Sequence, residues 1–250
     1  MPDATAMRCA SGHSFDLAKE GYVNLLPAGR LKGRPAGDDD SMGRARRLVF
    51  DAGLYQPIID RVAAVAAAQA PAFVLDAGCG EGSYLAAVTT AAGAEGWGID
   101  VSKAAVKLAA RRVRGHHFAV ASSYALPFAD EVFDVVINVF SPRDVAEMRR
   151  VLRPDGVAIV VTPGPDHLHE LKATVYTDAR RHRIDDDPAG VQHDEVVGFE
   201  VTLDDPQHRL ALLRMTPFWW SATQQRRDDV VAGLTSVTVD MRLRVFANPV

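Results

Sequence analysis

The residues best suited to chemistry in this chain begin with a glycine-rich run that follows a short apolar segment. The run reads Val74-Leu-Asp-Ala-Gly-Cys-Gly-Glu-Gly82, and its first residues are typical of a buried β-strand. Glycines at a strand end let the backbone turn tightly and approach a ligand without a Cβ clash. The spacing Gly78-x-Gly80-x-Gly82 differs from the pyrophosphate-binding G-x-G-x-x-G, and no P-loop lysine follows it. The run therefore predicts a ligand site at the carboxyl ends of the strands and argues against phosphate cradling.

Two acidic residues accompany the glycines. Asp76 precedes them inside the strand, and Asp100 closes the next predicted strand. A carboxylate at the position of Asp100 can accept hydrogen bonds from both hydroxyls of an adenosine ribose, although it could also cap the following helix together with Ser102. Asp76 either hydrogen-bonds the glycine loop or contacts the ligand directly. We interpret Cys79, between two glycines, as a small packing residue and not as a nucleophile.

Strands and helices alternate around this run. Continuous apolar strands separated by helices indicate a parallel sheet that is covered on both faces. Near the C-terminus, the residues 236–246 alternate between apolar and polar, which is typical of an antiparallel or edge strand. The predicted strands are 73–76, 96–100, 117–120, 133–139, 157–162, 197–203 and 236–246; the predicted helices are 43–52, 56–69, 82–92, 103–113, 143–152 and 167–183; 184–195 is predicted to be a polar loop. We expect an α/β, Rossmann-like fold with a mostly parallel seven-stranded sheet and an antiparallel C-terminal strand.

The length, net charge and cysteine content restrict the class of protein. The chain has 250 residues, a formal net charge of −4 and two cysteines, Cys9 and Cys79. We expect no disulfide framework, no signal peptide and no membrane contact, and therefore a soluble cytoplasmic protein. Residues 1–42 are polar and glycine-rich and contain a loop-like run over 29–40, so we separate this extension from a main domain over 43–250. A role with nucleic acid requires a local basic patch.

The motifs in combination resemble those of class I S-adenosylmethionine-dependent methyltransferases. They are Asp-Ala-Gly-Cys-Gly-Glu-Gly82, Gly98-Ile-Asp-Val-Ser102, Leu126-Pro-Phe, Phe133-Asp-Val-Val and Val151-Leu-Arg-Pro-Asp-Gly156. This resemblance covers roughly residues 72–162 and implies S-adenosylmethionine as the cofactor. By the same resemblance the methionine part meets Gly78, Gly80, Glu81 and Gly82, the ribose meets Asp100, and the adenine meets Ala121, Ser122 and Ser123. We add Asp76 and Asn138 to the candidate cofactor-binding residues. Many family members have an acid near the position of Ser122, and this chain has none.

A narrower resemblance extends over nearly the whole chain. The segments that carry it are His13–Leu26, Asp51–Pro57, Thr162–Leu171 and Met215–Phe218. They are similar to those of the 23S rRNA guanine-N1 methyltransferases, a family that includes enzymes giving resistance to tylosin-type macrolides. The resemblance implies Tyr55 and His167 as further cofactor contacts and ribosomal RNA as the substrate.

One departure from that family concerns zinc. Its members usually begin with a zinc knuckle made of C-x2-C and C-x3-H. The segment Cys9-Ala-Ser-Gly-His13 reproduces the second half, but no cysteine or histidine precedes Cys9. Two ligands do not make a closed four-ligand zinc site, so we predict no metal site and treat Cys9 and His13 as remnants of one. Zinc would need a distant ligand or a second chain to complete the site. The missing half of the knuckle favours a small metabolite as the substrate, because the knuckle is thought to help hold RNA.

Several candidates have two interpretations. Asn138 either positions a methyl acceptor or satisfies the end of its strand. His167 is either a site residue or a solvent-facing helix start, and Tyr55 is either a site or a core residue. Trp219 and Trp220 could stack RNA bases, but neighbouring residues point in different directions, so at least one of them should be packed core.

Basic residues could contact RNA phosphates, although charged loops are commonly just solvated. Three groups are candidates: Arg30, Lys32 and Arg34; Arg44, Arg46 and Arg47; and Arg180, Arg181 and Arg183.

Three functions follow from these observations. The first is methylation of N1 of a guanine in 23S rRNA, which requires loss of the N1 proton and is helped by a hydrogen-bond donor to O6. The target base would be flipped out or already unstacked. The second is methylation of a small metabolite on the same fold, and the third is a non-catalytic cofactor- or RNA-binding protein. The sequence leaves a homodimer open.

Overall fold

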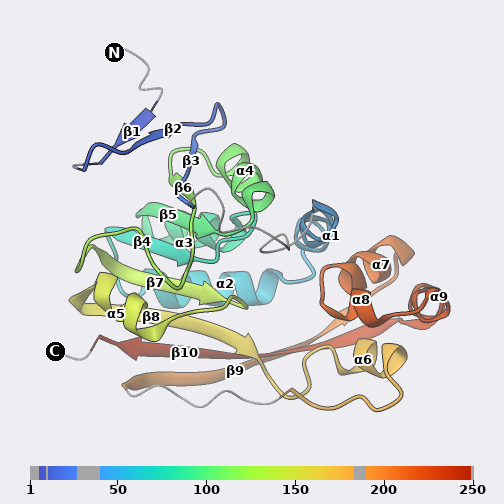
Figure 1. The fold of residues 1–250 in the computed structure, drawn as a ribbon. Coiled ribbons are helices and arrows are strands. Elements are labelled where there is room, and N and C mark those ends of the chain that lie inside the picture. Colours follow the sequence, from blue (N-terminus) through green and yellow to red (C-terminus); the bar gives the residue numbers. More distant parts are fainter. Residues whose placement is uncertain (1–5, 10, 27–39, 183–189, 249–250) are drawn as a thin grey trace.

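The computed structural model describes residues 6–9, 11–26, 40–182 and 190–248, shown in Figure 1. The basic candidates Arg30, Lys32, Arg34 and Arg183 lie outside the described residues. An eight-stranded sheet with the order β3-β6-β5-β4-β7-β8-β10-β9 forms the middle layer. Helices cover both of its faces, so the predicted Rossmann-like α/β architecture is confirmed.

Five parallel strands make the centre of the sheet. They are β4 (Phe73–Ala77), β5 (Glu95–Asp100), β6 (His117–Val120), β7 (Phe133–Val139) and β8 (Leu152–Pro163). The strands β4 and β7 are almost continuously apolar because both of their faces are covered. Since β4 pairs in parallel with β5 on one side and β7 on the other, the segments that follow these strands meet at one edge of the sheet.

Two core clusters lie on opposite faces of the sheet. The helices that follow the pattern of the sequence are α1 (Asp40–Asp51), α2 (Gln56–Ala67), α3 (Ser83–Ala92), α4 (Lys103–Arg112) and α5 (Val145–Val151). Val74 and Val135 pack with residues of α2, α3 and α4. Their neighbours Leu75 and Val136 point to the other face and pack with Met148 of α5. This alternation is the period of two that a strand imposes on its side chains.

The C-terminal strands are β9 (Val191–Thr202) and β10 (Ser236–Ala247). Because β10 runs antiparallel to both β8 and β9, the predicted antiparallel C-terminal strand is confirmed. The polar loop expected over 184–195 is wrong from Val191 onward, since β9 begins there. A long edge strand can be polar because its backbone pairs with β10 and its acidic side chains form ion pairs, such as Glu195 with Arg61 at 2.6 Å.

The helix expected over 167–183 is also wrong in extent. The structure has only α6 (His169–Val175), and Tyr176 already has an extended backbone with φ −114° and ψ 140°. Beyond this point Arg180 and Arg181 are exposed and pair with nearby acidic residues. A run of exposed basic residues presents no apolar face to the core, so packing does not stabilise further helical turns there.

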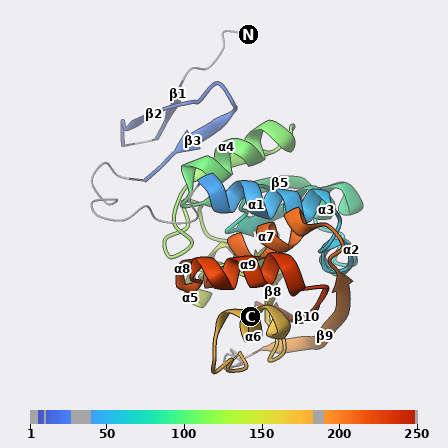
Figure 2. The ribbon, with the colours of Figure 1, turned by 90° about the vertical axis from the view of Figure 1, so that its right-hand side faces the viewer.

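Three further helices, which the sequence analysis did not identify, lie between β9 and β10. They are α7 (Pro206–Arg214), α8 (Phe218–Ser221) and α9 (Gln224–Gly233). Figure 1 shows them with α6 at the end of the sheet toward which β7 points. In Figure 2, α1 lies between α4 and α7, and α1 contacts both helices. The carboxyl ends of the central strands are therefore flanked by α1 and this helical group.

The N-terminal segment contributes to the sheet. A hairpin of β1 (Ala6–Arg8) and β2 (Ser14–Asp16) precedes β3 (Tyr22–Asn24), which pairs in parallel with β6. The expected seven strands are thus wrong by one, because the apolar residues Tyr22 and Val23 are buried against the sheet edge. The division into 1–42 and 43–250 stays a prediction.

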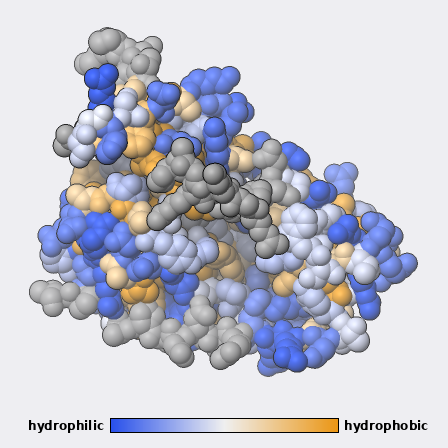
Figure 3. Space-filling view, in the orientation of Figure 1, coloured by the Kyte–Doolittle hydropathy of each residue, from blue (hydrophilic) through white to orange (hydrophobic). Residues whose placement is uncertain are grey.

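The described helices include none with both the length and the apolarity to cross a membrane. Hydrophilic side chains predominate on the face drawn in Figure 3, both around the N-terminal strands and over the helices α6 to α9. Apolar side chains are scattered among them on the described part of this face.

Candidate functional site

The glycine loop, Gly78–Gly82, joins β4 to α3 and is fastened to the neighbouring strand. The N–H groups of Gly78 and Cys79 both donate to the carbonyl oxygen of Ile99, at 2.9 and 2.8 Å. Gly78 has φ +105°, and a Cβ placed there would lie 2.0 Å from Oγ of Ser141. Only glycine fits this position, because the segment after β7 packs directly on the loop. Cys79 is buried.

Asp100 holds the same loop from the end of β5. Its Oδ2 accepts a hydrogen bond from the N–H of Gly80 at 3.0 Å, and its Oδ1 accepts one from the N–H of Ser102 at 2.8 Å. Ser102 caps α4 by accepting from the N–H of Ala105 at 3.3 Å. Carboxylate oxygens have further lone pairs, so the geometry is compatible with the predicted ribose contact.

Asp76 lies beneath the loop and is only 1% exposed. Its Oδ2 has no hydrogen-bond partner among the described residues. Burial, and then the negative charges of Asp100 and Glu81, raise the pKa of Asp76 well above its ordinary value, while a hydrogen bond with the Leu85 backbone opposes the rise. A buried carboxylate oxygen without a partner is unfavourable, and a cationic ligand group would satisfy it.

Glu81 has protein partners for both of its oxygens. Oε2 accepts a hydrogen bond from Nη1 of Arg112 at 2.5 Å, and Oε1 accepts one from the N–H of Ser83 at 3.2 Å. Nη2 of Arg112 also donates to Asp51 of α1 at 2.9 Å. Glu81 therefore ties the loop to α4 and α1, and its predicted contact with the cofactor stays a prediction.

Buried polar atoms without partners gather around this loop. Besides Asp76, the described residues place the hydroxyls of Tyr55 and Tyr84 and Oδ1 of Asn138 in buried positions without a hydrogen-bond partner. The amide nitrogen of Asn138 donates to the carbonyl oxygen of Ala77 at 2.6 Å, so half of this side chain supports the strand end. Such atoms require an explanation, and a polar ligand is one.

The structure adds two observations near the loop that the sequence analysis did not make. Tyr84 was missed, although its place just after the glycines at the start of α3 was a usable signal. Burial, followed by the charges of Tyr55 and Asp76, raises the pKa of Tyr84, and the charge of Arg46 opposes the rise. Arg46 is a candidate for contact with RNA phosphates, and its Nη1 lies 3.5 Å from where a Cβ of Gly80 would be. It therefore faces the glycine loop.

The segment after β6, predicted to meet an adenine, connects to the segment after β7. The N–H of Ala121 donates to the carbonyl oxygen of Asp100 at 3.1 Å. Ser123 Oγ donates to the carbonyl oxygen of Pro142 at 2.8 Å, and Ser122 Oγ accepts from the N–H of Tyr124 at 3.2 Å. The contacts of Ala121, Ser122 and Ser123 with a ligand stay predictions.

His167 lies at the same edge of the sheet. It is buried, it precedes α6, and its Nδ1 accepts a hydrogen bond from the N–H of Asp240 at 3.3 Å. Burial, followed by the charges of His182 and Lys172, lowers the pKa of His167 to about 3, so its ring is neutral. The interpretation of His167 as a solvent-facing helix start is wrong, because its side chain is buried.

An aromatic group surrounds His167. Its ring stacks on Phe140, with centroids 5.3 Å apart and planes at 27°. Tyr55 meets it edge-on, with centroids 6.3 Å apart and planes at 84°. The structure thus brings together Tyr55 and His167, the two residues that the narrower resemblance singled out, and adds Phe140, which the sequence analysis missed.

The zinc-knuckle remnant lies in the N-terminal hairpin, away from this site. Cys9 Sγ and His13 Nδ1 are 3.2 Å apart. Within residues 6–9, 11–26, 40–182 and 190–248, no cluster of three or more potential metal-binding side chains occurs. Two donors do not fit the four-ligand structural site that zinc requires, so no step is assigned to zinc.

The tryptophan pair of α8 divides as expected. Trp219 is held between the guanidinium groups of Arg214 and Arg227, whose Cζ atoms lie 4.6 and 3.9 Å from its ring centroid. Trp220 is 64% exposed. The packed member of the pair is therefore Trp219, and base stacking by Trp220 stays a prediction.

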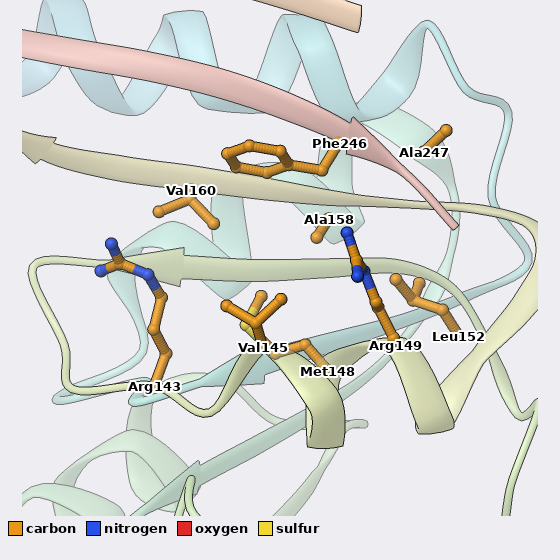
Figure 4. A pocket seen from close by; sticks show the side chains of 9 residues that line it. All are labelled: Arg143, Val145, Met148, Arg149, Leu152, Ala158, Val160, Phe246 and Ala247. Carbon is orange, nitrogen blue, oxygen red and sulfur yellow. The ribbon is translucent and has the colours of Figure 1, made fainter. Parts of the chain in front are cut away.

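A small cavity lies away from all these residues, between α5, β8 and the end of β10 (Figure 4). Its volume is about 20 Å³, enough for a single water molecule. Apolar side chains, including Met148, Val160 and Phe246, line most of it, and the predicted cofactor residues do not contribute to it. This cavity is a packing defect and not the site.

The contact between Gly78 and Ser141 generates a prediction. Gly78→Ala combines an unfavourable positive φ with a steric overlap, so we expect binding of S-adenosylhomocysteine to fall at least about 100-fold. Gly53→Ala is the matched control, because Gly53 also has a positive φ, +71°, but open space around its Cβ position. The control should unfold at a lower temperature with unchanged affinity by isothermal titration calorimetry. Equal affinities of the two variants would contradict the close-approach argument.

The raised pKa of Asp76 generates a second prediction. Because the pKa of Asp76 is higher in the folded than in the unfolded protein, binding of a proton to Asp76 stabilises the folded state. This stabilisation is complete below the unfolded-state pKa and is lost as pH rises through the folded-state pKa. The unfolding free energy of the ligand-free protein should therefore fall with pH across this window, and Asp76→Asn should lack this component. We also expect Asp76→Asn to weaken S-adenosylhomocysteine binding about 10-fold or more. Urea denaturation at several pH values and calorimetry check both parts; identical pH profiles would contradict the assignment.

Comparison with protein families and solved structures agrees with this geometry. Residues 74–156 match a family described as "Methyltransferase domain", and residues 1–33 match one described as "RlmA, N-terminal". A Bacillus halodurans protein, provisionally titled a methyltransferase, has a TM-score of 0.50 at 15% identity and covers 71% of this chain and 93% of its own. That likeness shows the fold. The methyltransferase domain implies S-adenosylmethionine as the cofactor.

Relatives of known name extend the match to most of the chain. A Streptomyces fradiae 23S rRNA (guanine(748)-N(1))-methyltransferase is 44% identical over 171 residues, which cover 66% of this chain and 60% of that protein. A Micromonospora griseorubida protein, provisionally named 23S rRNA (guanine-N(1)-)-methyltransferase, is 38% identical and covers 96% of this chain and 89% of its own. A similarly named Bacillus subtilis protein is 36% identical over 86% of this chain and 80% of its own. The chain belongs to the family of S-adenosylmethionine-dependent 23S rRNA (guanine-N1)-methyltransferases.

Proposed function

We propose that this protein transfers a methyl group from S-adenosylmethionine to N1 of a guanine in 23S rRNA. The observation that carries the proposal is that the likeness extends beyond the cofactor-binding domain. The Micromonospora griseorubida relative aligns with 96% of the chain, and the N-terminal residues 1–33 match the RlmA N-terminal family. A methyltransferase that shared only the cofactor site with this family would resemble it only around residues 74–156.

The proposed cofactor-binding residues contact different parts of the cofactor along the edge of the sheet. Asp76 would accept from the methionine ammonium group, Asp100 would bind the ribose hydroxyls, and the segment at Ser122 would meet the adenine. The loop Gly78–Gly82, with Glu81 clamped by Arg112, would cradle the methionine backbone. Tyr55, with its unpartnered hydroxyl, and His167 would complete the pocket on the β7 side.

The bound cofactor supplies an electrophilic methyl group on its sulfonium. The protein then has to align N1 of the guanine with the S–CH3 bond and exclude water. Asn138, at the end of β7, is the candidate that positions the acceptor, because its Oδ1 is buried without a partner among the described residues. Its carbonyl oxygen can accept a hydrogen bond from a base edge.

The proposed substrate implies where the protein acts and which surface residues contact it. Action on ribosomal RNA implies the cytoplasm, and exposed basic residues such as Arg44 and Arg180 are candidates for phosphate contacts. A homodimer and resistance to macrolides of the tylosin type remain part of the proposal. The Streptomyces fradiae relative is named for guanine 748, which makes the corresponding guanine the first place to look.

Mass spectrometry of large-subunit rRNA from cells with and without the gene tests the proposal. We expect loss of one N1-methylguanosine in its absence, restoration by the wild type, and no restoration by Asp100→Ala, which lacks the proposed ribose contact. Calorimetry with S-adenosylhomocysteine should show that Asp100→Ala has lost affinity while remaining folded.

An unchanged methylation map would remove rRNA as the substrate and leave the small-metabolite alternative. The non-catalytic alternative requires a separate measurement, which is turnover of S-adenosylmethionine to S-adenosylhomocysteine with rRNA or an extract of small metabolites. Turnover with either acceptor would eliminate it.

A further inference from the structure

Phe140 occupies an unusual position for a large apolar residue. It follows directly after β7, and its backbone has φ +50°, in the left-handed region that bulky residues rarely adopt. The N–H of Phe140 still donates to the carbonyl oxygen of Val161 at 3.0 Å, so this backbone is held by the sheet. Despite its apolar character the residue is 41% exposed. Uncommon backbone conformations of this kind cluster at functional sites.

The ring of Phe140 is supported from one side. His167 stacks on it at 5.3 Å and 27°, and His167 is itself fixed by the Asp240 backbone and by the edge of Tyr55. Because His167 is buried and neutral, it forms a flat support that does not repel a polar ligand by charge. A stack that covers one face, together with 41% exposure, leaves the Phe140 ring available to a second flat group.

The place of Phe140 in the sheet puts it on the β7 side of the glycine loop. The strand order β6-β5-β4-β7 puts the predicted adenine segment and Asp100 on one side of β4 and Phe140 on the other. The next residue, Ser141, packs against Gly78 of the glycine loop. Phe140 therefore lies beside the methionine end of the cofactor site, from which the methyl group is delivered; two residues later, Pro142 contacts the predicted adenine segment through its carbonyl oxygen, which accepts from Oγ of Ser123 at 2.8 Å.

We infer that Phe140 is the platform on which the target guanine stacks while its N1 is methylated. This inference rests on the proposed function. A guanine taken out of an RNA stack loses its neighbours, and an aromatic face replaces part of that stacking. A fixed ring also sets the plane of the base, which determines whether N1 points toward the sulfonium methyl.

The variants Phe140→Leu and Phe140→Tyr test this role. Leucine keeps an apolar side chain and the same backbone requirement but lacks the π face, whereas tyrosine keeps the face. With a 23S rRNA fragment that contains the guanine located by mass spectrometry, we expect Phe140→Leu to lower kcat/KM about 10- to 100-fold. Phe140→Tyr should stay within about 3-fold of the wild type. S-adenosylhomocysteine affinity and the unfolding midpoint should be close to wild type for both variants.

A spectroscopic measurement reports the stacking itself. The same fragment with 2-aminopurine in place of the target guanine should fluoresce more strongly in complex with Phe140→Leu than with the wild type or Phe140→Tyr, because an extruded base without a stacking partner is less quenched. Wild-type kcat/KM or wild-type quenching in Phe140→Leu would overturn the inference, and so would loss of S-adenosylhomocysteine binding, which would make the ring part of the cofactor pocket. Failure of the wild type to methylate any 23S fragment would instead be a failure of the proposed function.

Discussion

Three carboxylates, those of Asp76, Glu81 and Asp100, meet at the carboxyl ends of β4 and β5, where burial, and then the charges of the other two, raise the pKa of Asp76. Two of them are compensated within the protein: Glu81 by the guanidinium of Arg112, and Asp100 by the backbone N–H groups of Gly80 and Ser102. Asp76 has a buried oxygen without a partner among the described residues. S-adenosylmethionine carries an ammonium and a sulfonium group against a single carboxylate, so its charge is of the sign that this arrangement lacks. A cationic group of the cofactor beside Asp76 would therefore favour the ionised carboxylate and give its buried oxygen a partner.

The same electrostatic network reaches the N-terminal extension through α4. Arg112, at the end of α4, holds Glu81, while Lys107 and Arg111 of the same helix pair with Glu20 at 3.5 and 2.8 Å. The side chain of Glu20 is largely buried and lies just before β3, which extends the sheet beside β6. The described part of the segment that matches the RlmA N-terminal family therefore packs, through Glu20 and β3, against α4 and the main sheet. The last turn of α4 also holds the glycine loop, through the ion pair of Arg112 with Glu81. The same helix therefore positions both this part of the segment and the loop.

Physical differences between the elements explain which parts of the structure could be predicted from sequence. The parallel strands and the glycine loop were predictable because burial on both faces and tight turns leave marks in the residue types. The edge strand β9 was predicted only in its second half, as 197–203; its first half, from Val191, was not, since its exposed side chains resemble those of a loop and its stability comes from the β10 backbone. Arg46 carried a signal for RNA contact as one of a basic group, but only the packing of α1 shows that it faces Gly80. Phe140 was missed because nothing in a sequence marks a non-glycine residue that takes a left-handed backbone.

The arrangement around His167 also bears on how guanine N1 can lose its proton. The N–H of Asp240 donates to Nδ1 of His167, so the neutral ring carries its proton on Nε2. With its pKa lowered to about 3, this histidine is a hydrogen-bond donor at Nε2 and a poor proton acceptor at neutral pH. The oxygen of Asn138 accepts hydrogen bonds but is not a base. Neither His167 nor Asn138 is therefore suited to remove the N1 proton. Since the target guanine is inferred to stack on the face of Phe140 that His167 does not cover, the Phe140 ring separates the histidine from the base, and His167 acts by holding that ring in place. What these side chains supply is the position of the base, and removal of its proton falls to another group.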